Sequence, residues 1–185
     1  MRVIAGTARS MPLKTLRGME VRPTTDKTKE TLFNVLQVEV PGCRFLDLFS
    51  GSGGIAIEAL SRGAAHAVLV EQNKKALLCI KENLAFTKVA DRAEVFGCEA
   101  LTALRRMEGQ EVFDIIFMDP PYNQELERQV LEELADSTLA DADTIIVVEA
   151  SLDTDFSYLE ALGYQICKFK KYKTNQHVFL RKTGL

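Results

Sequence analysis

The chain has 185 residues, of which 46% are apolar, so it can bury the core of one domain, yet no apolar run approaches the roughly 20 residues of a membrane span. The four cysteines form no CxxC pair and there are two histidines, which argues against a metal site and predicts reduced thiols in a cytoplasmic protein without a signal peptide. The net charge of −3 conceals two basic ends on an acidic middle. Residues 1–30 carry seven Lys/Arg against three acids, residues 168–185 carry six against none, and residues 31–167 carry ten against 23. Basic ends of this kind predict a polyanionic partner.

The first 42 residues are expected to form an N-terminal arm and a helix. Residues 3–6 and 13–16 can pair as short strands around a polar turn. The segment Arg22-Pro23-Thr24-Thr25-Asp26 then breaks the chain and supplies N-cap residues for a helix over 26–37. Pro41-Gly42 ends this arm.

From residue 43 onward, apolar strand patterns alternate with helical ones. Strands are expected at 44–48, 67–71, 93–97, 112–118 and 144–149, and helices at about 53–62, 73–86, 99–107 and 124–135. After Glu149 the pattern changes to a short helix over 156–162 and a hairpin of 164–170 with 175–181. Alternation of this kind predicts an α/β fold with a mostly parallel sheet and an antiparallel edge. We find no repeat, dividing linker or oligomerisation signal, and expect a monomer with one domain over 1–185, made of an arm (1–42) and a core (43–185).

A glycine loop, Ser50-Gly51-Ser52-Gly53-Gly54, follows the first regular strand. Such a loop between strand and helix lets backbone N–H groups approach a ligand at the helix N-terminus. Gly51-x-Gly53-x-x-Ala56 satisfies the dinucleotide fingerprint, and Glu71, 20 residues on from Gly51, is suited to grip a ribose diol. An NAD-binding oxidoreductase is therefore one candidate.

Asp47, just before the glycines, argues against a dinucleotide. Its carboxylate would repel a pyrophosphate but would favour an ammonium or a sulfonium, and S-adenosylmethionine carries both charges and no phosphate. Glu99, after the third strand, can accept a hydrogen bond from an adenine amine, or can simply be an acid favoured by a helix N-terminus.

The strongest functional signal follows the apolar run Ile115–Met118, which ends in Asp119-Pro120-Pro121-Tyr122. Proline lacks an N–H and has a fixed φ, so the pair cannot continue a strand. The Asp119 carboxylate, the Pro120 carbonyl and the Tyr122 ring are therefore expected together at the carboxyl end of a strand, where ligands bind in open α/β sheets. Two acceptors beside a flat ring suit a planar group that carries an NH2.

With these residues in view, the chain resembles the class I S-adenosylmethionine-dependent methyltransferases, and more closely the bacterial family that methylates guanine N2 in 16S (small-subunit) ribosomal RNA. The resemblance covers nearly the whole chain. It is carried by Arg22-Pro-Thr-Thr-Asp26, Thr31-Leu-Phe-Asn34, Asp47 through Gly54, Glu58-Ala-Leu-Ser-Arg-Gly-Ala64, Glu71 and Asp119-Pro-Pro-Tyr122.

The resemblance implies a Rossmann-like, seven-stranded methyltransferase sheet and assigns roles within it. The methionine part of the cofactor would be held by Asp47, Ser50, Gly51 and Gly53, the ribose by Glu71 and the adenine by Glu99. Asp119, Pro120 and Tyr122 would hold the target base. Substrate RNA, within a small-subunit assembly intermediate, would contact Arg9, Arg22 and Thr24.

The arm departs from the family pattern at one point. The family usually has an Arg-Gly-Arg cluster after its first strand, whereas Ala8-Arg9-Ser10 retains only Arg9. Alternatives from other classes remain open. An N6-adenine DNA or RNA methyltransferase would use the same tetrapeptide, a glutamine-directed protein methyltransferase usually begins it with Asn, an oxidoreductase leaves it unexplained, and a non-catalytic RNA-binding module leaves the glycine loop unexplained.

Overall fold

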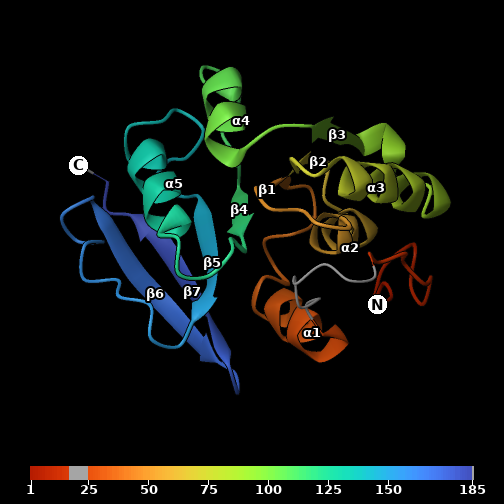
Figure 1. The fold of residues 1–185 in the computed structure, drawn as a ribbon, viewed down its shortest axis with the longest axis horizontal. Helices are drawn as coiled ribbons and strands as arrows, with labels where there is room; N and C mark the ends of the chain where they lie inside the picture. The colour runs from red at the N-terminus through yellow and green to blue at the C-terminus, as the bar shows by residue number, and fades with distance from the viewer. Residues whose placement is uncertain (17–24, 185) are drawn as a thin grey trace.

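The computed structural model describes residues 1–16 and 25–184. Its centre is one seven-stranded sheet in the order β3-β2-β1-β4-β5-β7-β6 (Figure 1). The strands are β1 (Arg44–Asp47), β2 (His66–Val70), β3 (Ala93–Phe96), β4 (Ile115–Met118), β5 (Ile145–Ser151), β6 (Tyr164–Lys171) and β7 (Asn175–Lys182). The first five strands pair in parallel, and β7 pairs antiparallel with both β5 and β6. The expected mostly parallel sheet with an antiparallel edge hairpin is confirmed.

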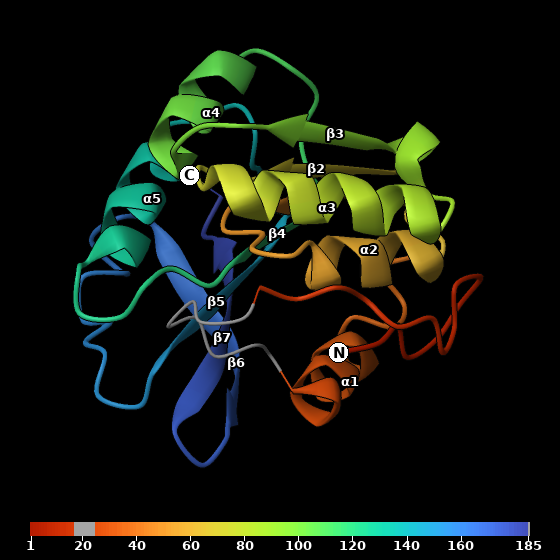
Figure 2. The same ribbon diagram turned by 45° about the vertical axis from the view of Figure 1, so that its right-hand side comes forward.

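Helices cover both faces of this sheet (Figure 2). They are α1 (Asp26–Val35), α2 (Gly54–Ser61), α3 (Lys74–Phe86), α4 (Ala100–Met107) and α5 (Leu126–Ala135), with a 3-10 turn η1 (Ala90–Arg92). One core contains residues of α1, α2 and α3 together with Phe45 and Phe117 of the sheet. The other contains residues of α4 and α5 together with Leu46 and Met118. Because neighbouring residues of a strand point to opposite faces, alternate positions of β1 and β4 serve the two cores.

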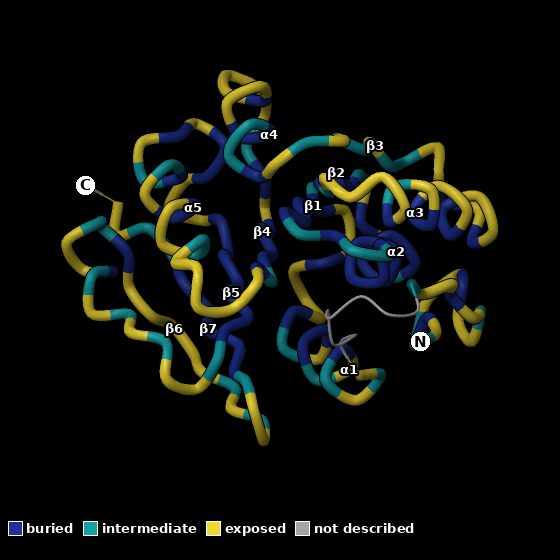
Figure 3. Tube along the Cα trace, in the orientation of Figure 1, coloured by how far each residue is buried: buried dark blue, intermediate teal, exposed yellow. Residues whose placement is uncertain are grey.

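Burial decreases from the centre of the sheet toward its antiparallel edge (Figure 3). β4 is buried at every position, which fits its unbroken apolar sequence. β6 is exposed at most positions after Tyr164, because it is the last strand of the sheet among the described residues. In the described ranges, none of the helices is both long and apolar enough to cross a membrane.

The arm pairs differently from the expectation for 3–6 and 13–16. The bonds join Met1–Val3 to Met11–Leu13, with Val3 N donating to Met11 O at 3.0 Å and Leu13 N donating to Met1 O at 3.0 Å. The result is a single bridge between Arg2 and Pro12 and no extended strand. Arg2 and Pro12 form a non-hydrogen-bonded pair, so the proline needs no N–H at this position.

Two further expectations are corrected. The segment 156–162 forms successive turns and no helix, since its hydrogen bonds mix three- and four-residue spacings before Gly163, which has φ +78. The helix expected from 124 begins at Leu126, because Glu125 takes up a left-handed conformation.

The arm is fixed to α2 by buried polar groups. The Glu58 carboxylate accepts from the Ile4 amide at 2.9 Å and pairs with Lys29 at 3.3 Å, and both side chains are fully buried. Gly6 lies so close to α2 that a Cβ on it would meet the Ser61 carbonyl oxygen at 1.8 Å. The arm and α1 are thereby held against the end of α2, and residues of the stretch Glu58–Ala64 make the contacts that hold them.

Candidate active site at the carboxyl edge of the sheet

The glycine loop joins the end of β1 to the start of α2. Gly51 and Gly53 have φ of +54 and +87, which side-chain-bearing residues rarely adopt. A Cβ on Gly53 would also lie 3.3 Å from Leu69. Ser50 is buried, and its hydroxyl donates to the Asp47 carbonyl at 3.0 Å. The loop therefore turns sharply into the N-terminus of α2, and the Gly51 and Gly53 amides donate to the Glu71 carboxylate and the Ser50 carbonyl.

Asp47 lies beneath this loop, with only 1% of its surface exposed. Burial raises the pKa of Asp47 to about 7, and the nearby charge of Glu71 adds to the rise. Asp47 has no ion pair with a described residue, and a buried carboxyl in this state favours the approach of a positive charge, which would restore the ionised form.

Glu71 and Glu99 occupy different settings. Glu71 follows β2 and accepts from the Gly51 amide and from the Asn73 amide, each at 2.8 Å. Glu99 is exposed at the N-terminus of α4 and makes no capping hydrogen bond with its side chain. The structure thus brings Glu71 to the glycine loop, whereas Glu99 stands at the end of the neighbouring strand β3.

Asp119 follows β4 in register with Glu149 of β5, because Met118 pairs with Val148 one position earlier. Asp119 is partly accessible, but its carboxyl group is largely enclosed by the protein. Burial is the main cause that raises the pKa of Asp119 well above its ordinary value, followed by the negative charges of Glu149 and Asp47. Asp119 is therefore the accessible member of three neighbouring acids at the carboxyl ends of β1, β4 and β5.

A buried network behind Asp119 was not anticipated from the sequence. Glu149 Oε2 lies 2.9 Å from His177 Nε2, and Glu149 Oε1 accepts from Asn175 Nδ2 at 2.7 Å. His177 is fully buried, and its Nδ1 lies 3.1 Å from the Tyr172 hydroxyl. One signal was present in the sequence: Glu149, like Asp119, is an acid at the end of an apolar run. Its partners depend on the antiparallel register of β7, which no local pattern specifies.

The loop after Asp119 turns outward. Pro120 is buried, whereas the Tyr122 side chain is 43% exposed. Asn123 and Glu125 both have positive φ, so this loop uses conformations that are uncommon for residues other than glycine. The aromatic ring therefore reaches the surface beside the carboxyl edge.

The residues expected to contact RNA fall in two groups. Arg9 is exposed at the tip of the arm, in the turn that follows Gly6. Arg22 and Thr24 lie outside the described residues.

The residues at this edge fit S-adenosylmethionine as a ligand. The glycine loop has no side chains at Gly51 and Gly53, which allows close backbone approach, and Asp47 supplies a buried carboxyl group for a cationic amino acid. Each Glu71 oxygen is held by one backbone amide and retains a lone pair for a ribose hydroxyl. Together these groups are the partners that a nucleoside carrying an amino acid requires.

Comparison with known proteins adds relatives to this geometry. A family model described as conserved hypothetical protein 95 matches residues 1–181. Bacillus subtilis (strain 168) YlbH, provisionally named an rRNA methyltransferase, is 40% identical over 150 residues, covering 80% of this chain and 82% of its own. Ribosomal RNA small subunit methyltransferase D of Haemophilus influenzae is 36% identical over 153 residues, covering 82% of this chain and 79% of its own. The solved structure of Escherichia coli yhhF, provisionally described as a methyltransferase, superposes with a TM-score of 0.88 at 30% identity, covering 100% of this chain and 99% of its own.

Proposed function

The chain belongs to the family of conserved hypothetical protein 95 and is a Rossmann-like rRNA methyltransferase, and we propose that it transfers a methyl group from S-adenosylmethionine to the exocyclic N2 amine of a guanine in small-subunit rRNA. The observation that carries the proposal is the meeting of two sites at one sheet edge. The Glu71–Gly51 contact and Asp47 would form the cofactor site, and Asp119 follows β4, the strand beside β1. The enzyme would act as a monomer in the cytoplasm, on an assembly intermediate of the small subunit.

The cofactor site would divide its ligand among these residues. Asp47 and the amides of the glycine loop would hold the amino acid, Glu71 the ribose hydroxyls and Glu99 the adenine amine. When bound, S-adenosylmethionine supplies an electrophilic methyl group, whose bond to sulfur breaks as the amine nitrogen attacks the carbon. The buried position of Asp47 supports this arrangement, since a cationic ligand compensates a carboxylate that is otherwise costly to ionise.

The base site would act by positioning and electrostatics. The amine of a nucleobase is a weak nucleophile because its lone pair is delocalised into the ring. The Asp119 carboxylate and the Pro120 carbonyl would accept its two N–H bonds, orient it and stabilise its growing positive charge. Asp119 would then take up the proton directly or through water, a task that its raised pKa favours. Tyr122 would stack on the base.

The guanine would be unpaired or flipped out of its helix. A base inside a duplex is inaccessible to these groups, and extrusion costs least where the base is already unpaired. The Asp119-Pro-Pro-Tyr122 tetrapeptide also suits N6-adenine methyltransferases, so the choice of guanine over adenine rests on the resemblance of nearly the whole chain to the guanine-N2 family.

Mass spectrometry of rRNA nucleosides tests the proposal. Small-subunit rRNA from cells without this protein should lack one N2-methylguanosine that reappears when the wild-type gene, but not an Asp119→Ala gene, is restored. An unchanged N2-methylguanosine content, or loss of N6-methyladenosine in its place, would reject the assignment.

A further inference from the structure

The edge strand β6 and the turn after it interleave lysines with aromatic residues. The sequence from 168 reads Lys168-Phe169-Lys170-Lys171-Tyr172-Lys173, and we refer to it as the basic edge segment. Within the described part of the chain, the ion-paired lysines are Lys14 and Lys29, so these four positive charges are uncompensated. A run of unpaired lysines with aromatic rings among them is the composition of a nucleic-acid contact.

Two of these lysines lie on the face of the sheet that carries Asp119. Lys170 pairs in register with His177, and His177 pairs with Glu149, which lies next to Asp119. Residues directly opposite each other on neighbouring strands share one face. Lys168, which pairs with Phe179, belongs to the same face. A row of paired residues therefore leads from the proposed base site across β5 and β7 to the half-buried Lys170 and the exposed Lys168 on β6.

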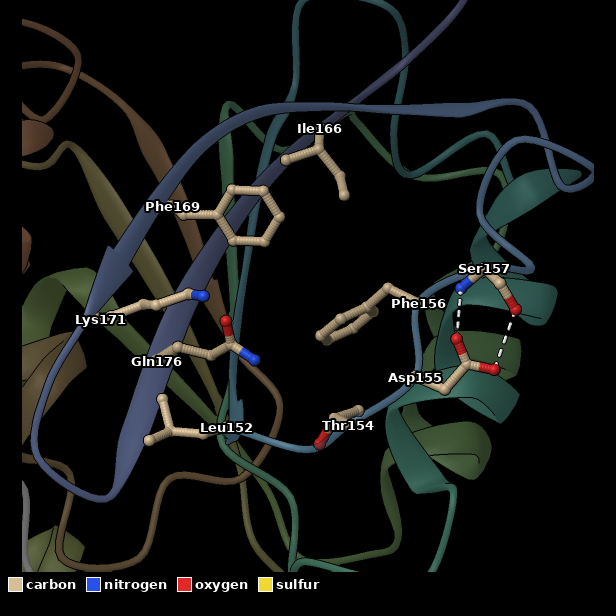
Figure 4. A pocket seen from close by; sticks show the side chains of 9 residues that line it. All are labelled: Leu152, Thr154, Asp155, Phe156, Ser157, Ile166, Phe169, Lys171 and Gln176. Carbon is tan, nitrogen blue, oxygen red and sulfur yellow. Dashed lines mark hydrogen bonds between the residues drawn. The ribbon is translucent and has the colours of Figure 1, made fainter.

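The opposite face of the segment lines a hollow of about 680 Å³ (Figure 4). Phe169 is 48% exposed, and the ring of Phe156 extends into the hollow from the opposite wall. Lys171 and Gln176 lie on the same wall, and Gln176 donates its amide to the Ser151 carbonyl, which leaves its own oxygen as an acceptor. The one acid of the lining, Asp155, is engaged by the Ser157 amide and hydroxyl. The hollow thus combines aromatic surface, a cation and a free acceptor.

We propose that the basic edge segment is a second contact surface for the substrate RNA, in which Lys168 and Lys170 neutralise backbone phosphates beside the active site and Phe169, with Phe156, stacks on an unpaired base next to Lys171. The proposal rests on the proposed function, since it takes the substrate to be RNA. Lysines on an edge strand also protect it from pairing with other chains. Protection against edge-to-edge pairing does not explain the exposed apolar side chains of Phe169, Ile166 and Leu152. These three line the hollow, and they are among the seven large apolar residues that are exposed in the described part of the chain.

Salt dependence of RNA binding tests the lysines. Binding of an unmodified small-subunit rRNA transcript would be measured by filter retention at several salt concentrations for the wild type, for Lys168→Ala/Lys170→Ala and for Lys75→Ala/Lys81→Ala. The control pair removes the same charge from exposed positions on α3, which lies near β2 and β3 at the opposite end of the sheet from β6. The first variant should flatten the slope of log K against log salt by roughly 1.4–1.8 for the two lost phosphate contacts, and the control should not.

Stacking is tested separately at Phe169. Phe169→Leu keeps apolar volume and removes the ring, and should weaken binding roughly 5- to 150-fold, the range found for loss of one stacked base. Phe169→Tyr keeps the ring and should bind as the wild type does. Melting temperatures of both variants should match the wild type, because the side chain is half exposed.

Other outcomes overturn the inference. If both double variants flatten the salt dependence equally, the lysines act only through the overall charge of the protein. If Lys168→Ala/Lys170→Ala leaves the slope unchanged, the basic edge segment does not contact the RNA. Normal binding of the transcript with weakened binding of small-subunit particles would assign the surface to a ribosomal protein. The proposed function fails in a different way. It would be rejected if the wild type neither bound S-adenosylmethionine nor methylated rRNA, and the comparison of salt slopes measures neither property.

Discussion

The Glu71 carboxylate accepts a hydrogen bond from the Gly51 amide at 2.8 Å, although the two residues are 20 positions apart. Its other oxygen accepts from the Asn73 amide at the same distance. The acid after β2 therefore fixes the glycine loop after β1 and the first turn of α3. A residue proposed to bind the ribose is thus also a structural part of its pocket, and its replacement has two separable effects.

Glu71→Ala should weaken S-adenosylmethionine binding and also lower the free energy of unfolding by about 1–2 kcal/mol, because two backbone amides lose their acceptor. Glu99→Ala is the matched control. It removes an exposed acid that makes no capping hydrogen bond, so it should weaken cofactor binding without loss of stability. Calorimetric titration and denaturant unfolding measure the two quantities, and cofactor affinity that survives Glu71→Ala would contradict the ribose role.

Asp47→Asn should stabilise the unliganded protein at high pH while it weakens cofactor binding. Burial raises the pKa of Asp47 to about 7, above the value of about 4 for an aspartate in an unfolded chain. The folded state therefore binds the proton more tightly, and the wild type loses stability as the pH rises from about 4 to 7. The asparagine variant should escape this loss, which is on the order of 4 kcal/mol for three pKa units. Thermal unfolding at pH 5 and pH 8 should show the larger gain at pH 8, because the wild type has lost only part of this stability at pH 5.

The same carboxyl group makes cofactor binding depend on pH. Below about pH 7 the unliganded protein holds Asp47 largely protonated, so binding of a cationic ligand must release that proton. Affinity of the wild type should fall as the pH is lowered from 7.5 to 5.5, and Asp47→Asn should bind weakly with little pH dependence. If both proteins show the same pH dependence, Asp47 does not face the positive charges of the ligand.

The alternation of strands and helices from residue 43 onward predicted the sheet well, because buried parallel strands have unbroken apolar sequences and the helices between them have a different period. Glu71 and the glycine loop were expected at the same edge of the sheet, because each follows the carboxyl end of a strand and the two strands are parallel. The Glu149–His177 pair did not follow, since it depends on which residues of a distant antiparallel strand come into register. The arm was mispredicted because its contacts come from α2, through Glu58 and Ser61, and from no periodicity of its own.

Arg9→Ala is a sharper test of the arm than deletion. Val3, Ala8 and Leu13 belong to the buried core, so removal of residues 1–20 would destabilise the protein as well as remove positive charge. Arg9 is exposed at the tip, and its replacement should flatten the salt dependence of rRNA binding by roughly 0.7–0.9 with no change in melting temperature. An unchanged slope would exclude Arg9 from the RNA contact.

Glu58→Ala, unlike Arg9→Ala, should lower the stability of the protein. It leaves the Lys29 ammonium buried without its carboxylate partner, so the free energy of unfolding should fall by about 3–5 kcal/mol. Burial already lowers the pKa of Lys29, and loss of the Glu58 charge, which opposes this effect, should lower that pKa further. A melting temperature within a degree of the wild type would mean that the arm does not depend on this pair.

Tyr122 separates stacking from hydrogen bonding at the proposed base site. Tyr122→Phe should retain most of the methyl-transfer rate, because stacking needs the ring, and Tyr122→Ala should lose more. Single-turnover rates with cofactor in excess measure the comparison. A phenylalanine variant as slow as the alanine variant would give the hydroxyl a role in the reaction.

Asp119 and Glu149 together make the most specific prediction. Asp119→Ala should lower the rate of methyl transfer by roughly 10²–10³ and leave cofactor affinity within a few-fold, since Asp119 faces the base. In the wild type, Asp119 must be ionised to accept the amine, so the rate should rise with pH through its raised pKa. Glu149→Gln removes one of the two neighbouring negative charges that raise this pKa, so the acid limb of the pH–rate profile should move to lower pH. Tyr172→Phe, which keeps Glu149 and His177 in place, should leave the limb where it is. An acid limb that Glu149→Gln does not move would show that the titrating group is not Asp119, and an Asp119→Ala enzyme of near-normal rate would remove that residue from catalysis.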